Sequence, residues 1–215
     1  MREDTFAPFR VNLPSAESSA GLYTVESFTV PDAWNRKRVQ HELEGRGVPP
    51  GVYTRLLRNR AKPSGDANGR EPGMVVMSDT PAELEDAMDF YRACESFGGR
   101  GVLIHGLGIG CTIRMALHAG ATNVTVVEKD EELMEMIAPH YSDSRVEIVL
   151  GDCLTYEHDP AERWGVVWHD IWDLISSGNL GEMRRLNLLF GRRSVWQGSW
   201  CQRECRELLE LENGR

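Results

Sequence analysis

The chain has 215 residues, of which 41% are hydrophobic and 27% are charged, a balance that is ordinary for a soluble globular protein. This length accommodates one domain with a substantial core, or one domain with a small appendage. Its apolar runs, such as Val124 to Val127, are too short to cross a bilayer, and the polar N-terminus has no apolar stretch behind it. We therefore expect neither a membrane segment nor a signal peptide.

The formal net charge of −9 is distributed unevenly along the chain. Residues 1–72 contain eleven Lys/Arg and nine Asp/Glu, so the rest holds thirteen of the 24 basic and twenty-four of the 33 acidic residues. The larger part of the chain thus carries a net charge of −11, which opposes the binding of a polyphosphate. We expect a small-molecule or cationic substrate rather than a nucleic acid.

The five cysteines also limit the class of protein. Their number is odd and the first three are scattered, which argues against a secreted disulfide framework and favours a cytoplasmic protein. Cys201 and Cys205 lie four residues apart on a predicted helix, but no nearby His or Cys completes a zinc site. We therefore expect no metal site.

The first third of the chain predicts an N-terminal arm and a small β-rich section, which we assign to residues 1–77. Residues 1–20 are polar and are expected to form a loosely ordered arm. β-Forming residues and turn residues then predict strands at 23–30, 52–57 and 74–77, a short helix within 31–46, and an exposed loop at 62–73.

From residue 78 onward the pattern is typical of an α/β fold. Thr80 and Glu83 flank Pro81 as in a capping box, which predicts a helix to about Ser96. Short apolar runs at 101–105, 123–128, 145–150 and 166–170 are predicted strands, and helical stretches separate them. This alternation of strands and helices with short connections predicts right-handed βαβ units and a parallel, Rossmann-like sheet over residues 78–175. Residues 176–215 are expected to add helices, at 181–190 and 201–212, packed on that domain.

A glycine turn, Gly106-Leu107-Gly108-Ile109-Gly110, joins the first of these strands to a helix. Glycine allows a tight turn and a close approach to a ligand, and the helix N-terminus supplies free N–H groups. The dinucleotide fingerprint requires glycine at position 111, where the chain has Cys111. The turn therefore favours binding of S-adenosylmethionine by all five residues over a pyrophosphate dinucleotide. A purely structural turn is the alternative.

Acidic residues follow the next two strands. Glu128 lies 18 residues after Gly110, where a carboxylate can accept hydrogen bonds from both ribose hydroxyls, and we place Lys129 beside it in the cofactor site. Asp152 can accept a hydrogen bond from the adenine amino group, and Cys153 is expected to lie against the adenine ring. The alternatives are an exposed strand-end carboxylate for Glu128 and a helix N-cap or Asx-turn for Asp152, and this turn is compatible with adenine binding.

The fourth strand ends in His169-Asp170, followed by Ile171-Trp172-Asp173. Ligands of open α/β sheets bind at the carboxyl ends of the strands, so this segment is expected beside the reactive end of the cofactor. We predict that Asp170 and Asp173 are catalytic, because two carboxylates can hold a cationic amine or take its proton, and that Asp170 also contacts the cofactor. His169 and Trp172 are predicted to bind the substrate, Trp172 through its π-face. A helix cap is the alternative for Asp173.

At these residues, over roughly 75–175, the chain resembles class I S-adenosylmethionine-dependent methyltransferases, and within them the spermidine-synthase-like group. The resemblance rests on Gly106 to Gly110, Glu128, Gly151-Asp152 and the segment from Asp170 to Asp173. The spermidine synthases also have a small β-domain before the nucleotide fold, and their active site uses an Asp-x-x-Asp element similar to Asp170-Ile171-Trp172-Asp173.

The resemblance carries three departures. Aminopropyltransferases have an acid inside the glycine turn where this chain has Ile109, and a proline after the Asp-x-x-Asp pair where it has Leu174. Class I methyltransferases usually have seven strands, whereas four are predicted here, so the sheet is expected to be truncated. The N-terminal section, the C-terminal helices or a second subunit is then expected to close the site. The sequence therefore predicts a methyltransferase acting on a small or cationic acceptor. Aminopropyl transfer and a non-catalytic cofactor-binding or assembly protein are the alternatives.

Overall fold

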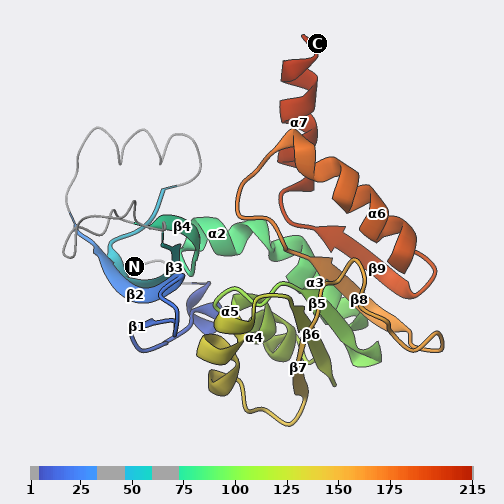
Figure 1. Cartoon of the computed structure of the whole chain (residues 1–215), viewed down its shortest axis with the longest axis horizontal. Helices are drawn as coiled ribbons and strands as arrows, with labels where there is room; N and C mark the ends of the chain where they lie inside the picture. The colour runs from blue at the N-terminus through green and yellow to red at the C-terminus, as the bar shows by residue number, and fades with distance from the viewer. Residues whose placement is uncertain (1–4, 33–46, 60–72, 215) are drawn as a thin grey trace.

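The computed structural model describes residues 5–32, 47–59 and 73–214. The helix expected within 31–46 and the loop expected at 62–73 lie almost entirely outside these ranges. Two sheets dominate the described part of the chain, an antiparallel one near the N-terminus and a parallel one covered by helices (Figure 1). Among the described residues, no helix is both long and apolar enough to cross a membrane.

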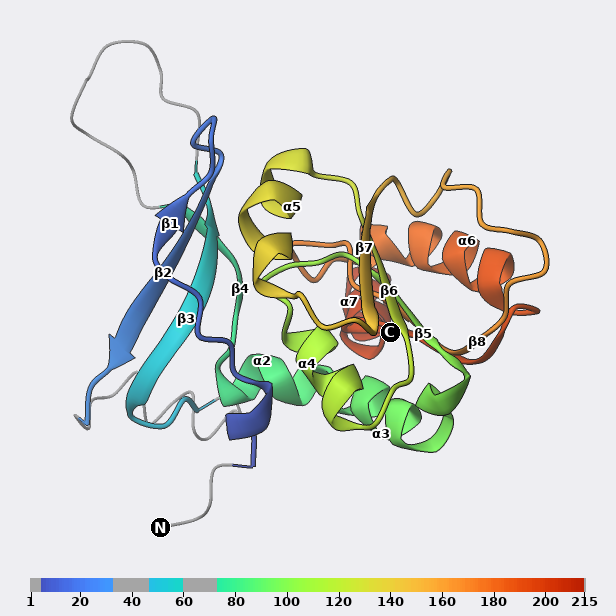
Figure 2. The ribbon, with the colours of Figure 1, turned by 90° about the horizontal axis from the view of Figure 1, so that it is seen from below.

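The N-terminal sheet has four antiparallel strands in the order β1-β2-β3-β4, which run through Ala16–Glu17, Tyr23–Val30, Gly51–Arg58 and Met74–Ser78. The strand predicted at 23–30 is confirmed as β2, in which Tyr23 and Val25 are buried on one face near the start of the strand, and Ser27 and Thr29 farther along that face are exposed. Figure 2 shows this sheet standing beside the helical part of the molecule, with β4 leading directly into α2.

The expectation of a loosely ordered arm at residues 1–20 is wrong for the described residues. The segment forms a short 3-10 helix, η1 (Ala7–Phe9), and three of its side chains are at most 6% exposed: Phe9, Val11 and Leu13. The buried carboxylate of Asp79 accepts hydrogen bonds from the backbone N–H groups of Val11 (3.0 Å) and Thr54 (2.6 Å). The polar composition of the segment concealed the few apolar residues that pack in the core.

The second sheet has five parallel strands in the order β7-β6-β5-β8-β9. They run through Val146–Leu150, Val124–Glu128, Val102–His105, Trp164–His169 and Ser194–Ser199. This order defines a Rossmann-like α/β fold. Successive strands are added toward one edge of the sheet from β5 to β7 and toward the other edge from β8 onward, so the switch point of the topology lies between β5 and β8. The first four strands match the predicted apolar runs.

The fifth strand, β9, corrects the expectation that only helices follow Asp170. Residues 180–190 form α6 and 202–212 form α7, as predicted, but Ser194–Ser199 pairs in parallel with β8. The C-terminal segment 176–215 therefore completes the sheet and does not only pack on it. The sheet has five strands rather than four, and it remains shorter than the seven of the resembling family.

Helices cover both faces of this sheet. One face packs against α3 (Met88–Phe97) and α4 (Cys111–His118), and the other packs against α6 (Leu180–Phe190). Helix α5 (Glu131–Ile137) lies over β6 and β7 on the side of α4. Because both faces are covered, β5 and β8 are buried along their whole length.

The predicted capping box is only partly realised. Thr80 is the N-cap of α2 (Pro81–Asp86), but its side chain makes no capping hydrogen bond, and its hydroxyl lies 3.0 Å from Ser78 Oγ. The predicted single helix is interrupted at Ala87, whose backbone dihedral angles are not helical, and α3 begins at the next residue. Glu83, in the first turn of α2, lines a cavity.

Candidate functional site

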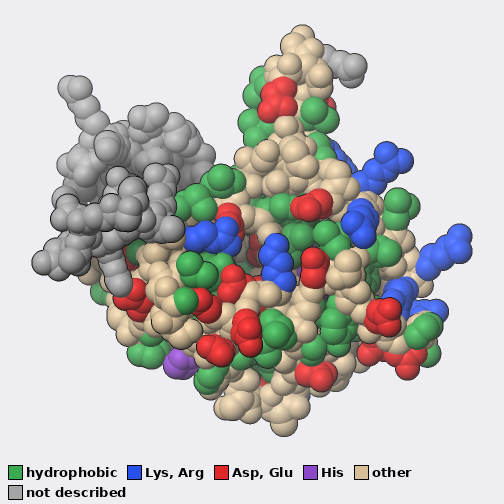
Figure 3. Space-filling view, viewed as in Figure 1, with side chains coloured by type: hydrophobic (Ala, Val, Ile, Leu, Met, Phe, Trp, Pro, Cys, Tyr) green, Lys and Arg blue, Asp and Glu red, His purple; other side chains and the backbone are tan. Residues whose placement is uncertain are grey.

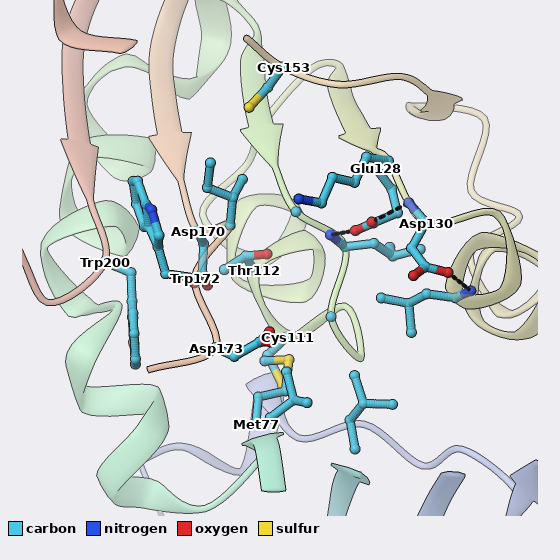
Figure 4. A pocket seen from close by; sticks show the side chains of 18 of the residues that line it. Met77, Cys111, Thr112, Glu128, Asp130, Cys153, Asp170, Trp172, Asp173 and Trp200 are labelled. Carbon is cyan, nitrogen blue, oxygen red and sulfur yellow. Dashed lines mark hydrogen bonds between the residues drawn. The ribbon is translucent and has the colours of Figure 1, made fainter. Parts of the chain in front are cut away.

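A cavity of about 230 Å³ lies where the carboxyl ends of the parallel strands face the N-terminal sheet (Figure 4). Two cationic side chains line it among the described residues, Arg58 and Lys129. The carboxylates that line it are Glu83, Glu128, Asp130, Asp152, Asp170, Asp173 and Glu182. Figure 3 shows acidic and basic side chains gathered in the middle of this face. The excess of acids makes the cavity suited to a cationic ligand.

The glycine turn borders the cavity, and its three glycines all have positive φ, at 94°, 51° and 84° for Gly106, Gly108 and Gly110. At each glycine, another group of the protein occupies the space that a Cβ atom would need. A Cβ on Gly106 would overlap the Asp170 carbonyl, one on Gly108 would overlap Met77 Sδ, and one on Gly110 would overlap the Tyr141 ring. The tight turn predicted from the sequence is therefore present, and close packing within the chain already requires glycine at these positions.

Only part of the turn faces the cavity. Gly106, Leu107 and Gly108 line it, whereas Ile109 and Gly110 are not among its described lining residues. Ile109 is fully buried, its N–H lies 3.1 Å from Met77 Sδ, and its carbonyl accepts a hydrogen bond from Tyr141 Oη at 2.5 Å. A direct cofactor contact through the side chain of Ile109 does not fit this position.

Glu128, at the end of β6, is 6% exposed, and its carboxylate lies between the glycine turn and Asp130 (Figure 4). Its Oε2 accepts a hydrogen bond from Leu107 N and its Oε1 accepts one from Asp130 N, both at 2.8 Å. Each carboxylate oxygen can accept a further bond, so hydroxyl groups of a ligand can still donate to it. Glu128 therefore stabilises the glycine turn and remains a suitable ribose acceptor. Lys129 follows it at the rim.

Asp152 and Cys153 follow β7 at one end of the cavity. Asp152 Oδ1 accepts a hydrogen bond from Leu154 N at 2.9 Å, so the Asx-turn alternative is confirmed, while the exposed side chain still lines the cavity. Burial raises the pKa of the Cys153 thiol to about 12, so this thiol is neutral at physiological pH and is a poor nucleophile.

Asp170 follows β8 at the switch point, with its backbone carbonyl against Gly106 and its side chain near Thr112 (Figure 4). Desolvation by burial raises the pKa of its carboxyl from 3.8 to about 7, and the negative charges of Glu83, Asp86 and Asp173 act in the same direction. The side chain of Trp168 opposes this rise. A carboxyl that titrates near neutrality and borders a cavity is a suitable general acid or base.

Asp173 is engaged by the N-terminal sheet. Its Oδ2 accepts a hydrogen bond from Arg58 Nη1 within an ion pair, and Arg58 Nη2 donates to Tyr23 Oη at 3.0 Å. Tyr23 Oη in turn donates to Asp130 Oδ2 at 2.8 Å. We call the chain Asp173–Arg58–Tyr23–Asp130 the polar bridge. It links β2 and β3 to the segments that follow β8 and β6.

Two indole rings form another wall of the cavity. Trp172 and Trp200 lie on the side opposite Glu128 and Asp130, with Asp170 between the two sides (Figure 4). Trp172 Nε1 donates to Glu182 Oε2 at 2.8 Å, which fixes the ring beside the opening. Trp172 was predicted at the site, whereas Trp200, which directly follows β9, was not.

His169 does not fit the predicted role in substrate binding. It is fully buried, its Nδ1 lies 2.8 Å from His105 Nδ1, and its Nε2 lies 3.4 Å from Gln197 Oε1. The ring of Phe190 on α6 covers it, with ring centroids 5.6 Å apart. Residues alternate along a strand, so His169 points under α6 while the next residue, Asp170, borders the cavity.

Several lining residues escaped the sequence analysis, among them Tyr23, Arg58, Met77, Glu83, Thr112 and Trp200. Most come from the N-terminal sheet or from helix faces whose position over the cavity depends on the tertiary fold. The basic N-terminal section was the one available signal for Arg58. Among the described residues, no three His, Cys, Asp or Glu side chains are arranged to hold a metal ion.

No family model matches the sequence. An 88-residue stretch is 32% identical to polyamine aminopropyltransferase 2 of Hyperthermus butylicus and covers 37% of this chain. The match spans 29% of the length of that relative.

Among solved structures, the chain is similar to a putative RNA methyltransferase from Pyrococcus horikoshii, with 22% identity and a TM-score of 0.41 over 60% of this chain and 67% of that one. It is also similar to a putative methyltransferase from Escherichia coli, with 12% identity and a TM-score of 0.43 over 55% of this chain and 66% of that one.

Proposed function

We propose that this protein is an S-adenosylmethionine-dependent methyltransferase that acts on a small, cationic acceptor. The observation that carries the proposal is the acid-rich cavity at the carboxyl ends of the strands, directly after a glycine turn. A dinucleotide brings a pyrophosphate into such a cavity, where the carboxylates repel it, whereas a sulfonium is attracted. The resemblance of the sequence to class I methyltransferases points the same way.

The cofactor would lie across the strand ends. Glu128 would accept hydrogen bonds from the ribose hydroxyls, and Asp152 would accept one from the adenine amino group beside Cys153. When bound, S-adenosylmethionine would supply an electrophilic methyl group on a positively charged sulfur. The lining carboxylates would favour that charge, which is why the acidity of the cavity fits this cofactor.

The acceptor would enter between the indole rings and Asp170. Trp172 and Trp200 offer π-faces to a cation or a flat ring, and Glu83 adds a negative charge beside Asp170. With a pKa of about 7, the Asp170 carboxylate would take the proton that an amine or hydroxyl acceptor must lose. A polyanionic nucleic acid is a poor fit to the same charges.

Calorimetric titration tests the cofactor. We expect S-adenosylmethionine and S-adenosylhomocysteine to bind, and NAD not to bind, since only NAD carries a pyrophosphate. Asp152→Asn should weaken both adenosyl ligands, while Asp143→Asn, in the loop before β7, is the matched control. Absence of binding by both adenosyl ligands at millimolar concentration would remove the basis of the proposal.

Release of S-adenosylhomocysteine tests catalysis and the acceptor. A panel of amines of increasing charge, with neutral isosteres as controls, should show turnover with the cationic members. Asp170→Asn should lower the rate on the order of a hundredfold or more, the range of general acid–base catalysis. Turnover that is unaffected by Asp170→Asn would contradict the assigned role.

Aminopropyl transfer is the second candidate, and the similarity to a polyamine aminopropyltransferase favours it. The same cavity would then hold decarboxylated S-adenosylmethionine and transfer its aminopropyl group to an amine. Formation of 5′-methylthioadenosine instead of S-adenosylhomocysteine would identify this reaction.

A further inference from the structure

Arg58 stands apart from the other side chains that line the cavity. Seven described carboxylates line the cavity, and Arg58 is one of two cations that face them. The other, Lys129, follows β6 on the ribose side of the proposed cofactor site. Arg58 comes from the end of β3, outside the Rossmann-like sheet, and reaches the segment after β8 through Asp173.

The guanidinium of Arg58 is held in place yet remains accessible. Within the described part of the chain, its bonds to Asp173 and Tyr23 use two of its five N–H donors. The Tyr23 ring supports it, with Arg58 Cζ 5.5 Å from the ring centroid. The side chain is 45% exposed. A guanidinium fixed from two sides, with donors left over, is suited to a carboxylate.

The polar bridge places this guanidinium between the segments that follow β6 and β8. Adenine is assigned to the end of β7 and ribose to the end of β6, so the remaining part of the cofactor runs past β5 toward β8. In the order β7-β6-β5-β8, the outer two strands are three strand spacings apart, roughly 14 Å, which is the span that the cofactor would cover. The methionyl tail would thus run toward Asp173, which holds Arg58. Of the two possible cofactors, only S-adenosylmethionine has a carboxylate there.

We propose that Arg58, supported by Tyr23 and Asp173 in the polar bridge, binds the α-carboxylate of the cofactor and makes the site select S-adenosylmethionine over its decarboxylated form. This inference rests on the proposed function, because it requires an adenosyl ligand in this cavity. Without Arg58, the surrounding acids favour the decarboxylated molecule, which lacks the negative group. A single side chain of the N-terminal sheet then decides between methyl and aminopropyl transfer.

The test compares the affinities of three ligands for the wild type and for Arg58→Ala. The wild type should bind S-adenosylmethionine more tightly than decarboxylated S-adenosylmethionine. Arg58→Ala should reduce this ratio by about tenfold or more, because a charge-assisted hydrogen bond is lost. Binding of 5′-methylthioadenosine, which has neither carboxylate nor amine, should stay unchanged and shows that the variant is folded.

Arg55→Ala is the matched control, since Arg55 lies on the same strand and pairs with Glu26 instead of lining the cavity. It should leave the ratio as in the wild type. Equal binding of the two cofactors by the wild type, or an unchanged ratio in Arg58→Ala, overturns this inference alone. Failure of all three ligands to bind the wild type overturns the proposed function as well.

Discussion

His169 and Asp170 are neighbours in the sequence, and they belong to two different environments at the end of the same strand. His169 and His105 lie under α6 with both rings fully buried, whereas Asp170 borders the acid-lined cavity. Desolvation lowers the pKa of His169 to about 4 and raises that of Asp170 to about 7. Burial thus favours the neutral form of both residues, but only Asp170 titrates near physiological pH.

The contrast shows what makes a buried ionisable group useful for chemistry. The imidazoles are enclosed by aromatic rings, with Phe190 4.8 Å from His105 and 5.6 Å from His169 between ring centroids. Asp170 is surrounded by like charges at the rim of a cavity. We infer that the histidine cluster stabilises the packing of α6, while Asp170 lowers stability to gain a proton acceptor.

The largest effect is expected for Asp170→Asn. Because the folded pKa of Asp170 lies above its ordinary value of 3.8, the folded protein loses stability as the pH rises through about 7. The shift corresponds to at most about 4 kcal/mol. Asp170→Asn should therefore be more stable than the wild type above pH 7 and lose this advantage toward pH 4, as measured by urea unfolding. Asp152→Asn, exposed on the same cavity, should show no comparable gain.

The histidine cluster should behave in the opposite sense. The folded pKa of His169 lies below the ordinary 6.5, so its contribution is present above pH 6.5 and is lost as the pH falls to about 4. The loss is at most about 3 kcal/mol. His169→Gln should make the unfolding free energy less dependent on pH in this window, whereas the exposed His140→Gln should not. A wild-type free energy of unfolding that does not change between pH 6.5 and 4 would contradict this interpretation of the cluster.

A smaller effect is expected at the glycine turn. Gly108→Ala places a Cβ at φ +51° and against Met77 Sδ, so it should lower the free energy of unfolding by about 2 kcal/mol. Gly120→Ala is the control, because Gly120 has φ +88° and nothing within 4 Å of an added Cβ. Thermal unfolding should show a larger loss for Gly108→Ala, and Met77→Ala should relieve the excess. Equal losses at both glycines would mean that the Met77 contact is unimportant.

The smallest effect is expected for Gln197→Leu. The interaction between His169 Nε2 and Gln197 Oε1, at 3.4 Å, raises the pKa of His169 against the stronger lowering by desolvation. Its removal should lower this pKa further, which NMR titration of the imidazole can measure. The pKa of Asp170 should not change, since the two groups lie in separate environments. A shift of both would show that the two environments are coupled.

Much of the Rossmann-like sheet could be predicted from the sequence, because buried parallel strands are short apolar runs separated by amphipathic helices. The strand β9 was missed, since Trp196, Gln197 and Gly198 give no such run on an edge strand that is half exposed. The polar N-terminal segment was misassigned because its core contacts rest on a few separated residues, Phe9, Val11 and Leu13.

By itself, the sequence determined the glycine turn, the acids after successive strands and the presence of a small β-rich section, because these depend on local backbone preferences and on strand order. Only the tertiary structure decided which side chains meet at the cavity. The alternation along β8 turned His169 away and kept Asp170, and the position of the N-terminal sheet brought Arg58 to Asp173 across 115 residues of sequence. Such encounters depend on how two sheets pack, which local sequence patterns do not encode.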